Sequence, residues 1–501
     1  MLANVKCFTL NGLDGYAVDV EADVNNGMPS FELVGLPDAA VKESKERVRS
    51  AVKNSGNVFP THKITVNLAP ADLRKEGTQF DLAIAVCILK ATGQLYIGDE
   101  NVVFLGELAL DGKVRGVSGM LPLLISARDR GYTTFFIPKD NENEASYLSG
   151  ITVYPVERIS EIVSHIGGEN LIEPIRPHLF SGSSVRDDAD LSFVKGQAVA
   201  KRAVEIAVSG GHNILLVGPP GAGKTMLARC IPGILPDLTF EEALEVTKIH
   251  SVAGILTEEG IVSNRPFRSP HHTATTVSLC GGGNTKIHPG EVSLAHNGVL
   301  FLDELPEYNR SALEALRQPL EDGVITIARS VGAYRYPASF ILCASMNPCP
   351  CGNYGSEKPC NCSPYDIKRY RAKISGPLLD RIDLQVEVDS VSYDDLISEK
   401  QEEPSSAVKL RVEAAREIQR KRFRGKIHTN SEMRERELSV FCKLSSECET
   451  ILKSAFSRLD LSARGRARMI KVARTIADLD GSAEIEPKHI LEAVSYRTFE
   501  R

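Results

Sequence analysis

Hydrophobic and polar positions follow three successive patterns along the chain. Up to about residue 175, β-type runs such as KITVNLAP (63–70) and TTFFIP (133–138) alternate with helical runs such as QFDLAIAVCILKATG (79–93). Apolar positions with a period of two indicate strands, and those with a period near 3.6 indicate helices. The first pattern therefore predicts an α/β domain over residues 1–175.

The second pattern begins after a stretch rich in Pro, Ser, Gly and charge, which we expect to be a linker over residues 176–192. From 193 to 395, short apolar strands such as NILLV (213–217) and VLFL (299–302) alternate with helices, which favours an α/β core with a parallel sheet. From 405 to 501 the apolar spacing is helical, as in ARMIKVARTIADL (467–479). This third block predicts a C-terminal helical domain.

Composition narrows the class of protein. The chain has 501 residues, of which 42% are hydrophobic and 25% charged, so disordered and collagen-like classes are excluded. No apolar run approaches the roughly 20 residues of a membrane helix, and we expect no membrane partner. The N-terminus lacks the pattern of a secretory leader, and the 11 cysteines are an odd number, so we expect a cytoplasmic protein with reduced thiols. A net charge of −6 excludes a uniformly basic protein but permits a local basic face.

The sequence GPPGAGKT predicts a phosphate-binding loop, because it fits G-x-x-x-x-G-K-[ST] between an apolar strand and a helix. In such a loop, backbone N–H groups and the helix N-terminus surround the phosphates of ATP. Lys224 adds a positive charge and Thr225 can ligate Mg²⁺. The predicted cofactor-binding residues are Gly218, Pro219, Pro220, Gly221, Ala222, Gly223, Lys224 and Thr225.

Two further strand ends and one residue before a strand could complete an ATP-hydrolysing site. The strand VLFL ends in Asp303 and Glu304, which would bind Mg²⁺ and act as general base; alternatively they are solvated acids. Asn347 ends another apolar strand and could hold the attacking water. Arg381 precedes a further strand and could reach a phosphate in a neighbouring subunit, or form a structural salt bridge.

These motifs, in this order, resemble those of AAA+ ATPases. The strings RPFRSPHHTAT (265–275), MNPCPCGNYG (346–355) and ISGPLLDRIDL (374–384) resemble the magnesium-chelatase-like YifB/ComM family, and the resemblance covers all three blocks. It implies a Mg²⁺-dependent ATPase that forms a homo-hexameric ring. It also implies a helicase on single-stranded or branched DNA that drives branch migration in natural transformation and recombination. Asn347 would then be sensor 1, Arg381 the trans arginine finger, and Arg464 the sensor 2 arginine of the helical lid.

Two insertions follow from the same resemblance. The segment around residues 254–275 resembles the helix-2 insert of chelatases and MCM helicases. The segment GVITIARSVGAYRYPASF (323–340) resembles their pre-sensor-1 hairpin, with a turn near Ser330 to Ala333. Arg329 matches the position that carries a basic residue to DNA, and Arg335 lies on the return strand. The alternative is a plain surface hairpin.

The N-terminal block resembles a Lon-protease-like domain, on the strings GTQFDLAIAVCILKATG (77–93) and FLGELALDGKVRGVSGMLPLL (104–124). Gln79 stands where the resemblance places the catalytic serine of Lon, and the later lysine is not evident. A serine–lysine mechanism needs a nucleophile and a base. We therefore expect no peptidase activity, and a scaffold or DNA-contact role instead.

Four cysteines lie close together in a loop rich in Gly and Pro. Cys349, Cys351, Cys360 and Cys362 form a C-x-C-x₈-C-x-C pattern. Four thiolates could close a tetrahedral Zn²⁺ site. The alternative is four free thiols, because C-x-C is less usual than C-x-x-C. His271 and His272 are adjacent and cannot both face one ion from a regular element, so a structural role is expected for them.

A second basic feature lies in residues 409–426. Arg416, Arg420 and Arg424 recur every four residues, so on a helix they would form one stripe that could follow DNA phosphates. The alternative is a solvated helix face.

Two other functions compete with a DNA motor: a chelatase-type remodelling subunit that inserts Mg²⁺ into a porphyrin, and a non-motor regulator whose assembly is switched by ATP. The chain has no D-x-S-x-S string, which argues against the chelatase.

Overall fold

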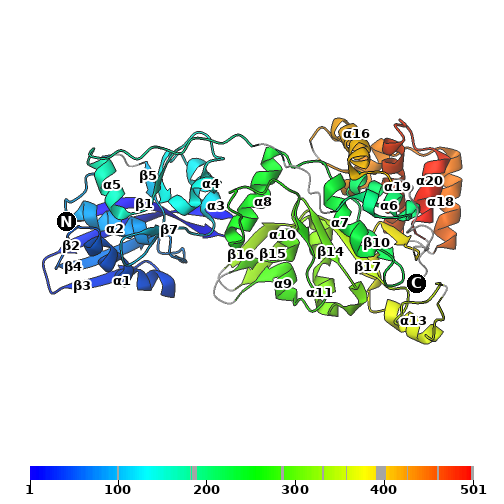
Figure 1. The fold of residues 1–501 in the computed structure, drawn as a ribbon, viewed down its shortest axis with the longest axis horizontal. Coiled ribbons are helices and arrows are strands. Elements are labelled where there is room, and N and C mark those ends of the chain that lie inside the picture. Colours follow the sequence, from blue (N-terminus) through cyan, green and yellow to red (C-terminus); the bar gives the residue numbers. More distant parts are fainter. Residues whose placement is uncertain are drawn as a thin grey trace.

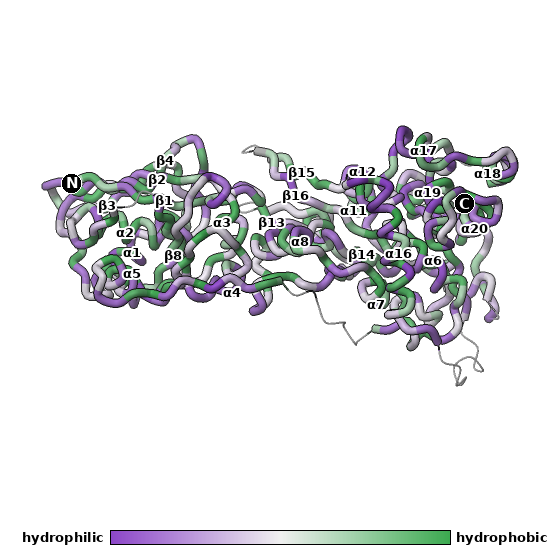
Figure 2. The backbone as a smooth tube through the Cα atoms, turned by 90° about the horizontal axis from the view of Figure 1, so that it is seen from above, coloured by the Kyte–Doolittle hydropathy of each residue, from purple (hydrophilic) through white to green (hydrophobic). Residues whose placement is uncertain are grey.

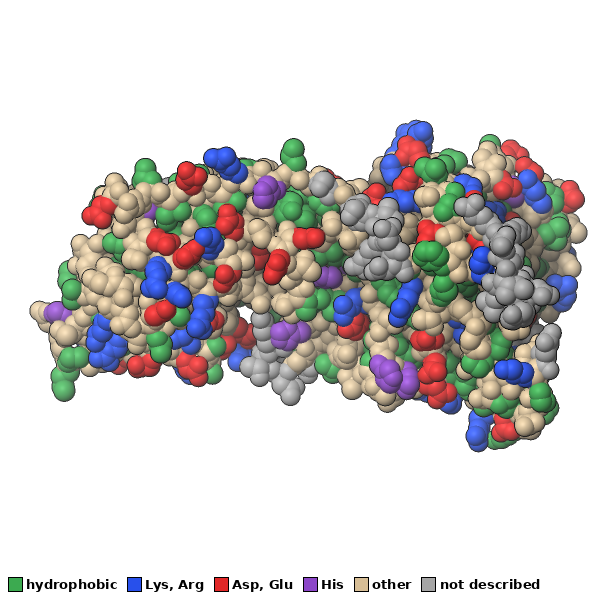
Figure 3. Space-filling view, in the orientation of Figure 1, with side chains coloured by type: hydrophobic (Ala, Val, Ile, Leu, Met, Phe, Trp, Pro, Cys, Tyr) green, Lys and Arg blue, Asp and Glu red, His purple; other side chains and the backbone are tan. Residues whose placement is uncertain are grey.

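The computed structural model describes residues 1–98, 101–180, 182, 189–283, 287–329, 332–356, 358–390, 402–425, 427–459 and 462–497. An N-terminal α/β part lies at one end, a central sheet in the middle and a group of helices at the other end (Figure 1). Acidic and basic side chains are intermingled on the face shown in Figure 3. No helix among the described residues is long and apolar enough to cross a bilayer.

The N-terminal part is built on a mixed seven-stranded sheet in the order β3-β4-β2-β1-β5-β8-β9. Its long strands β1 and β2 pair antiparallel, and residues of alternating burial direct one face of these strands towards the core. Helix α2 is buried almost throughout, which explains its nearly unbroken apolar sequence. The strands are β1 (Leu2–Asn11), β2 (Asp14–Asn25), β3 (Ser30–Val34), β4 (Lys63–Ala69), β5 (Val102–Phe104), β6 (Glu107–Leu108), β7 (Val114–Arg115), β8 (Thr134–Pro138) and β9 (Thr152–Val156). The helices are α1 (Ala39–Asn54), α2 (Asp81–Ala91), α3 (Met120–Arg128), α4 (Glu142–Ala145) and α5 (Ile159–Ile166).

The central part confirms the predicted parallel α/β core. Its five strands lie in the order β11-β14-β17-β10-β18 and all pairs are parallel. Their carboxyl ends therefore meet at one edge of the sheet. The strands are β10 (Ile214–Val217), β11 (Phe267–Arg268), β14 (Val299–Leu302), β17 (Ile341–Met346) and β18 (Leu384–Glu387). The helices are α6 (Ala198–Gly210), α7 (Lys224–Ile234), α8 (Phe240–Ala253), α9 (Thr276–Cys280), α10 (Glu291–Leu294), α11 (Arg310–Ala315), α12 (Arg317–Asp322), α13 (Pro364–Arg371) and α14 (Gly376–Leu379).

The C-terminal part is helical, as predicted, and shares a core with the central sheet. Ile476 and Met469 belong to the same hydrophobic cluster as Leu216 and Phe301 of the sheet. Helix α6 also contributes to this cluster and is largely hydrophobic in Figure 2, whereas α12 is mostly hydrophilic. The helices are α16 (Ser405–Phe423), α17 (Glu435–Phe441), α18 (Ser446–Arg458), α19 (Ala463–Leu479) and α20 (Pro487–Ser495). Of the expected linker, residues 181 and 183–188 lie outside the described residues, and so does the expected core boundary at 395.

The N-terminal part is joined to the segment around α8 by specific contacts. Ser251 Oγ donates a hydrogen bond to Glu144 Oε2 at 2.7 Å, and the backbone N–H of Gly119 donates to Ser251 O at 3.0 Å. Asn143 Nδ2 donates to Glu258 O at 2.7 Å. Burial raises the pKa of Glu144 above its ordinary value. The N-terminal part is therefore seated on the end of α8, through Ser251, and on the start of the expected helix-2 insert, through Glu258.

Candidate nucleotide-binding site

The predicted phosphate-binding loop follows β10, which lies between β17 and β18 in the sheet, and ends at α7. The first N–H groups of a helix have no partner within it, so the start of α7 presents donors to the loop. Gly221 and Gly223 have φ values of +81° and +88°, and nothing lies within 4 Å of where a Cβ would stand at either position. This open, glycine-dependent backbone is what close approach of a phosphate requires.

Lys224 lies at the centre of the site. Its Nζ donates to Gly218 O at 2.6 Å, to Pro219 O at 2.9 Å and to Asn347 Oδ1 at 3.2 Å. Burial lowers the pKa of Lys224, although Asp303 and Glu304 act in the opposite direction. Lys224 follows β10 and Asn347 follows β17, and the two side chains meet because these strands are neighbours in the sheet.

Thr225 and Asp303 form a pair of oxygen ligands suited to Mg²⁺. Thr225 Oγ1 donates to Asp303 Oδ2 at 3.0 Å. The other oxygen, Asp303 Oδ1, accepts a short hydrogen bond from Ser345 Oγ. A hydroxyl and a carboxylate are typical Mg²⁺ ligands beside phosphates, so this donor set fits the ion. Ser345 was missed in the sequence; its only signal is a polar residue within the fully buried strand β17.

Glu304 projects from the same strand end as Asp303. Its backbone has a φ of +53°, and its N–H donates to Asp303 Oδ1 at 3.1 Å. His272 Nδ1 lies 3.4 Å from Glu304 Oε2. The ring of His271 stacks against that of His272 with centroids 4.1 Å apart. His271 Nδ1 lies 2.9 Å from Thr273 Oγ1, so the two histidines have different polar partners, and the structural role expected for them stays a prediction.

The two other candidate arginines meet at a different carboxylate. Arg381 is only 7% exposed and forms a close ion pair with Glu321 of α12. Arg464, at the start of α19, lies 3.5 Å from the other oxygen of Glu321 and is 64% exposed. Arg381 also lines a cavity of about 610 Å³ together with Glu314, Arg317 and Glu321. No sequence motif marked Glu321, the carboxylate that forms ion pairs with both arginines.

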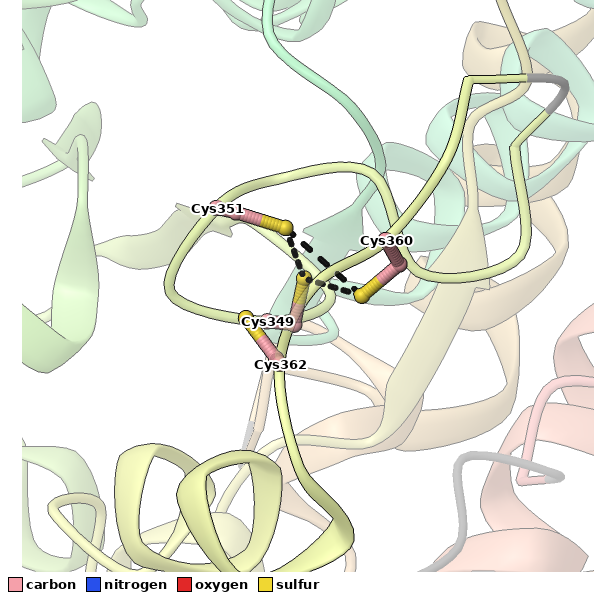
Figure 4. A group of neighbouring side chains, drawn as sticks. All are labelled: Cys349, Cys351, Cys360 and Cys362. Carbon is pink, nitrogen blue, oxygen red and sulfur yellow. Dashed lines mark hydrogen bonds between the residues drawn. The ribbon is translucent and has the colours of Figure 1, made fainter.

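The four cysteines converge in the loop after Asn347 (Figure 4). Cys349 Sγ lies 3.4 Å from Cys351 Sγ and 3.7 Å from Cys360 Sγ, and the Cys351–Cys360 distance is 3.6 Å. All four sulfurs lie within 4.8 Å of one another. Tetrahedral Zn–S bonds of about 2.3 Å would place sulfurs about 3.8 Å apart, so the geometry fits Zn²⁺. A hydrogen bond from the backbone of Asn353, together with the Cys349 thiol, lowers the pKa of Cys351 to about 6.

The expected hairpin is formed by β15 (Val324–Arg329) and β16 (Gly332–Pro337), which pair antiparallel. Arg335 is exposed on the return strand, whereas the side chain of Arg329 and residues 330 and 331 of the expected turn lie outside the described residues. Tyr336 is buried and donates from its hydroxyl to Ile287 O at 3.4 Å. Leu13, in the turn between β1 and β2, packs on the cluster that contains Tyr336. A Cβ at Gly12 in the same turn would stand 3.9 Å from Arg335 O and from Tyr334 Cδ1, so the N-terminal part packs beside β16.

The N-terminal position matched to the Lon serine has a local partner. Gln79 Nε2 donates to Glu76 O at 2.8 Å, and Gln79 O accepts from the backbone N–H of Gly106 at 3.0 Å. Absence of peptidase activity stays a prediction.

The expected arginine stripe is not continuous, which corrects the sequence-based picture. Arg416 is turned towards α6, where Nε and Nη2 donate to Val208 O at 3.2 and 2.7 Å. Burial lowers the pKa of Arg416 to about 10. Arg420 is exposed and pairs with Glu417 at 2.5 Å. Arg424 lies beyond the last residue of α16 with a φ of +51°, so the helical spacing ends before it.

Comparisons with known proteins agree with the motifs. The profile described as "Magnesium chelatase, subunit ChlI" matches residues 190–396, "Subunit ChlI of Mg-chelatase" matches 20–141, and "Magnesium chelatase, subunit ChlI C-terminal" matches 402–497. The uncharacterized protein YifB of Escherichia coli is 44% identical over 98% of this chain and 96% of its own length. The competence protein ComM of Haemophilus influenzae is 43% identical over 98% of this chain and 96% of its own.

The Lon protease of Brevibacillus choshinensis is 25% identical over 163 residues, which is 30% of this chain and 21% of its own length. This likeness agrees with the Lon-like character expected for the N-terminal block. Because relatives above 40% identity span nearly the whole chain, the protein belongs to the YifB/ComM family of magnesium-chelatase-like AAA+ ATPases.

Proposed function

We propose that this protein is a Mg²⁺-dependent ATPase that acts as a homo-hexameric DNA motor, promoting branch migration in natural transformation and recombination. The observation that supports ATPase activity is that two hydrogen-bonded pairs lie at one edge of the sheet, namely Lys224 with Asn347 and Thr225 with Asp303. The similarity to a competence protein supports the DNA-directed role.

Each residue of the set has a distinct task. The N–H groups of the loop and Lys224 bind the phosphates, and Thr225 and Asp303 hold Mg²⁺, which neutralises phosphate charge. Glu304 accepts a proton from the attacking water as general base. Asn347, already bonded to Lys224, orients that water. Lys224→Ala should abolish ATP binding, measured with a fluorescent ATP analogue.

Arg381 and Arg464 complete the site from the adjacent subunit. Both contact Glu321, whereas the phosphate-loop side chains contact Asp303 and Asn347. An arginine delivered to a phosphate from a neighbour stabilises the charge of the transition state. A ring is the arrangement in which each subunit supplies these arginines to the next.

The hairpin β15–β16 is the proposed DNA contact, through Arg335 and Arg329. The test is a branch-migration assay on a four-way junction with Arg335→Ala and with the Arg329→Ala/Arg335→Ala double variant. We expect ATP turnover to persist while strand displacement falls at least about tenfold, since each lost phosphate contact weakens binding. Lys453→Ala, which removes an exposed lysine from α18, is the matched control and should behave as wild type.

A second assay, of ATP turnover, separates a DNA motor from the two competing functions. A chelatase-type remodelling subunit or an ATP-switched assembly regulator would hydrolyse ATP without stimulation by DNA. Turnover measured with and without forked DNA therefore decides between them and a motor. Sizing by light scattering with and without nucleotide tests the hexamer.

We also propose that the four-cysteine loop binds one Zn²⁺, supported by sulfur separations of 3.4–3.7 Å. Metal analysis should find one zinc per chain, lost in the Cys349→Ser/Cys360→Ser variant. Metal-free protein with full activity would exclude it. None of the eleven cysteines forms a disulfide among the described residues, which is typical of a reducing compartment and supports the cytoplasm as the site of action.

A further inference from the structure

His272 lies beside the proposed general base although the two residues are 32 positions apart in sequence. Its Nδ1 is 3.4 Å from Glu304 Oε2, with side chains 32% and 55% exposed. Glu304 follows β14 and His272 follows β11, and these strands pair in parallel. Both residues are therefore brought to the same edge of the sheet.

The loop that carries His272 is held on two sides. Tyr308 is 5% exposed and its hydroxyl donates to Pro270 O at 2.5 Å. Its ring also meets that of His272 edge-on, with centroids 6.5 Å apart. On the other side, His271 stacks on His272 and its Nδ1 lies 2.9 Å from Thr273 Oγ1. These contacts hold the imidazole of His272 in place.

Glu304 is constrained at its backbone and depends on neighbours for the direction of its carboxylate. Its φ of +53° is a left-handed conformation that non-glycine residues adopt only when the surroundings impose it. Its N–H is directed to Asp303 Oδ1 and Ser345 Oγ at 3.1 and 3.4 Å. The carboxylate of Glu304 takes no part in these two contacts, and the imidazole of His272 faces it.

We propose that His272 is a positioning residue for ATP hydrolysis, which donates from Nδ1 to the carboxylate of Glu304 and holds it towards the attacking water. This inference rests on the proposed ATPase function. The 3.4 Å separation exceeds the usual 2.7–3.2 Å of an N–H···O bond. Catalytic hydrogen bonds tighten when substrate is bound, so we expect the contact to shorten in the nucleotide complex.

The test separates the N–H donor from the packing of the ring. His272→Phe keeps an aromatic ring against His271 and Tyr308 but removes the donor, whereas His272→Asn places an amide N–H near the position of Nδ1. We expect kcat to fall about 10- to 100-fold in His272→Phe, because a misplaced base loses that much rate, while the Kd for a fluorescent ATP analogue stays within twofold. His272→Asn should restore kcat to within about threefold of wild type.

His62→Phe is the matched control, since His62 is an exposed histidine of the N-terminal part, next to β4 and outside the nucleotide site. It should leave kcat unchanged, and all variants should share the thermal midpoint of wild type. The proposal is overturned if His272→Phe keeps full kcat, or if His272→Phe and His272→Asn lose rate equally. Wild-type protein without ATP turnover would overturn the proposed function and this inference together; active wild type with an unaffected His272→Phe overturns this inference alone.

Discussion

Gly352 of the four-cysteine loop lies directly against Pro220 of the phosphate-binding loop. A Cβ at Gly352 would stand 2.7 Å from Pro220 Cδ, a distance that side-chain carbons do not adopt. The loop that gathers the four thiols is therefore packed onto the segment that would surround the phosphates. A stiff four-cysteine loop would brace that segment, and a distorted one would shift it.

Gly352→Ala should weaken ATP binding because the added methyl group collides with Pro220. Gly355→Ala is the matched control: the φ values are similar, +82° and +79°, but nothing lies within 4 Å of a Cβ at Gly355. Both variants carry the same backbone strain, on the order of 1–2 kcal/mol. We expect the Kd for a fluorescent ATP analogue to rise about tenfold more in Gly352→Ala, equivalent to roughly 1.4 kcal/mol. Equal Kd values would show that the contact does not influence the nucleotide site.

Arg464→Ala should inactivate the neighbour's site rather than its own. We expect ATP turnover to fall about 100-fold or more, since an arginine supplied in trans contributes a factor of this size or larger. Mixing Arg464→Ala with Lys224→Ala should restore turnover, because one variant keeps the phosphate loop and the other keeps the arginine. Arg466→Ala removes a half-exposed neighbour on α19 that pairs with Glu449, and it should remain active. Mixtures as inactive as their components would place Arg464 at the site of its own subunit.

Asp383→Asn should loosen the lid from the sheet. The carboxylate is 8% exposed, with Oδ2 at 3.3 Å from His212 Nδ1 and Oδ1 at 3.3 Å from Arg468 Nε of α19. Removal of one partner from a buried ion pair costs about 3–5 kcal/mol of the free energy of unfolding. Asp129→Asn, at a residue 61% exposed, should change it by less than about 0.5 kcal/mol. Urea unfolding at pH 7 compares the two.

The difference in the free energy of unfolding between wild type and Asp383→Asn should also depend on pH. Burial alone would raise the pKa of Asp383, but His212 and Arg468 hold it well below the ordinary value of 3.8. A depressed folded-state pKa contributes stability that is complete above the unfolded value and is lost as pH falls below it. The gap between wild type and Asp383→Asn should therefore narrow as pH falls below 3.8. A gap that is unchanged at pH 3 would contradict the assignment.

Arg416→Ala should destabilise the fold, whereas Arg420→Ala should not. Arg416 donates two hydrogen bonds to Val208 O near the end of α6, and loss of such charged donors costs about 1.5–3 kcal/mol. Arg420 is 70% exposed and its pair with Glu417 contributes at most about 1 kcal/mol. Thermal unfolding checks the difference. If DNA follows this helix, Arg420→Ala should reduce the salt dependence of DNA binding without changing stability. An equal loss of stability in Arg416→Ala and Arg420→Ala would contradict this division of roles.

The parts of the site that could be predicted are those in which strand, turn and functional residue are contiguous. The phosphate loop follows an apolar strand and begins a helix, and Asp303 and Glu304 end another strand, so local pattern was enough. The close spacing of the four cysteines was predictable for the same reason, whereas the hairpin β15–β16 was expected from its resemblance to the pre-sensor-1 hairpin of related ATPases.

The arginine stripe failed for the opposite reason. Helical spacing predicted that Arg416, Arg420 and Arg424 share one face, but spacing does not tell which face is covered by another helix or where the helix ends. The contact of Arg416 with Val208 crosses 208 positions of sequence.

The sequence by itself determined the family of this protein, its phosphate-loop motif, the two candidate carboxylates that follow β14, and its order of α/β, α/β and helical parts. Only the tertiary structure decided the partners of these groups, namely Ser345 for Asp303, Glu321 for Arg381 and Arg464, His272 for Glu304, and Pro220 for Gly352. The physical reason is that motifs depend on backbone conformation over a few residues. Partners depend instead on parallel strands and packed helices that bring distant segments to one edge of a sheet.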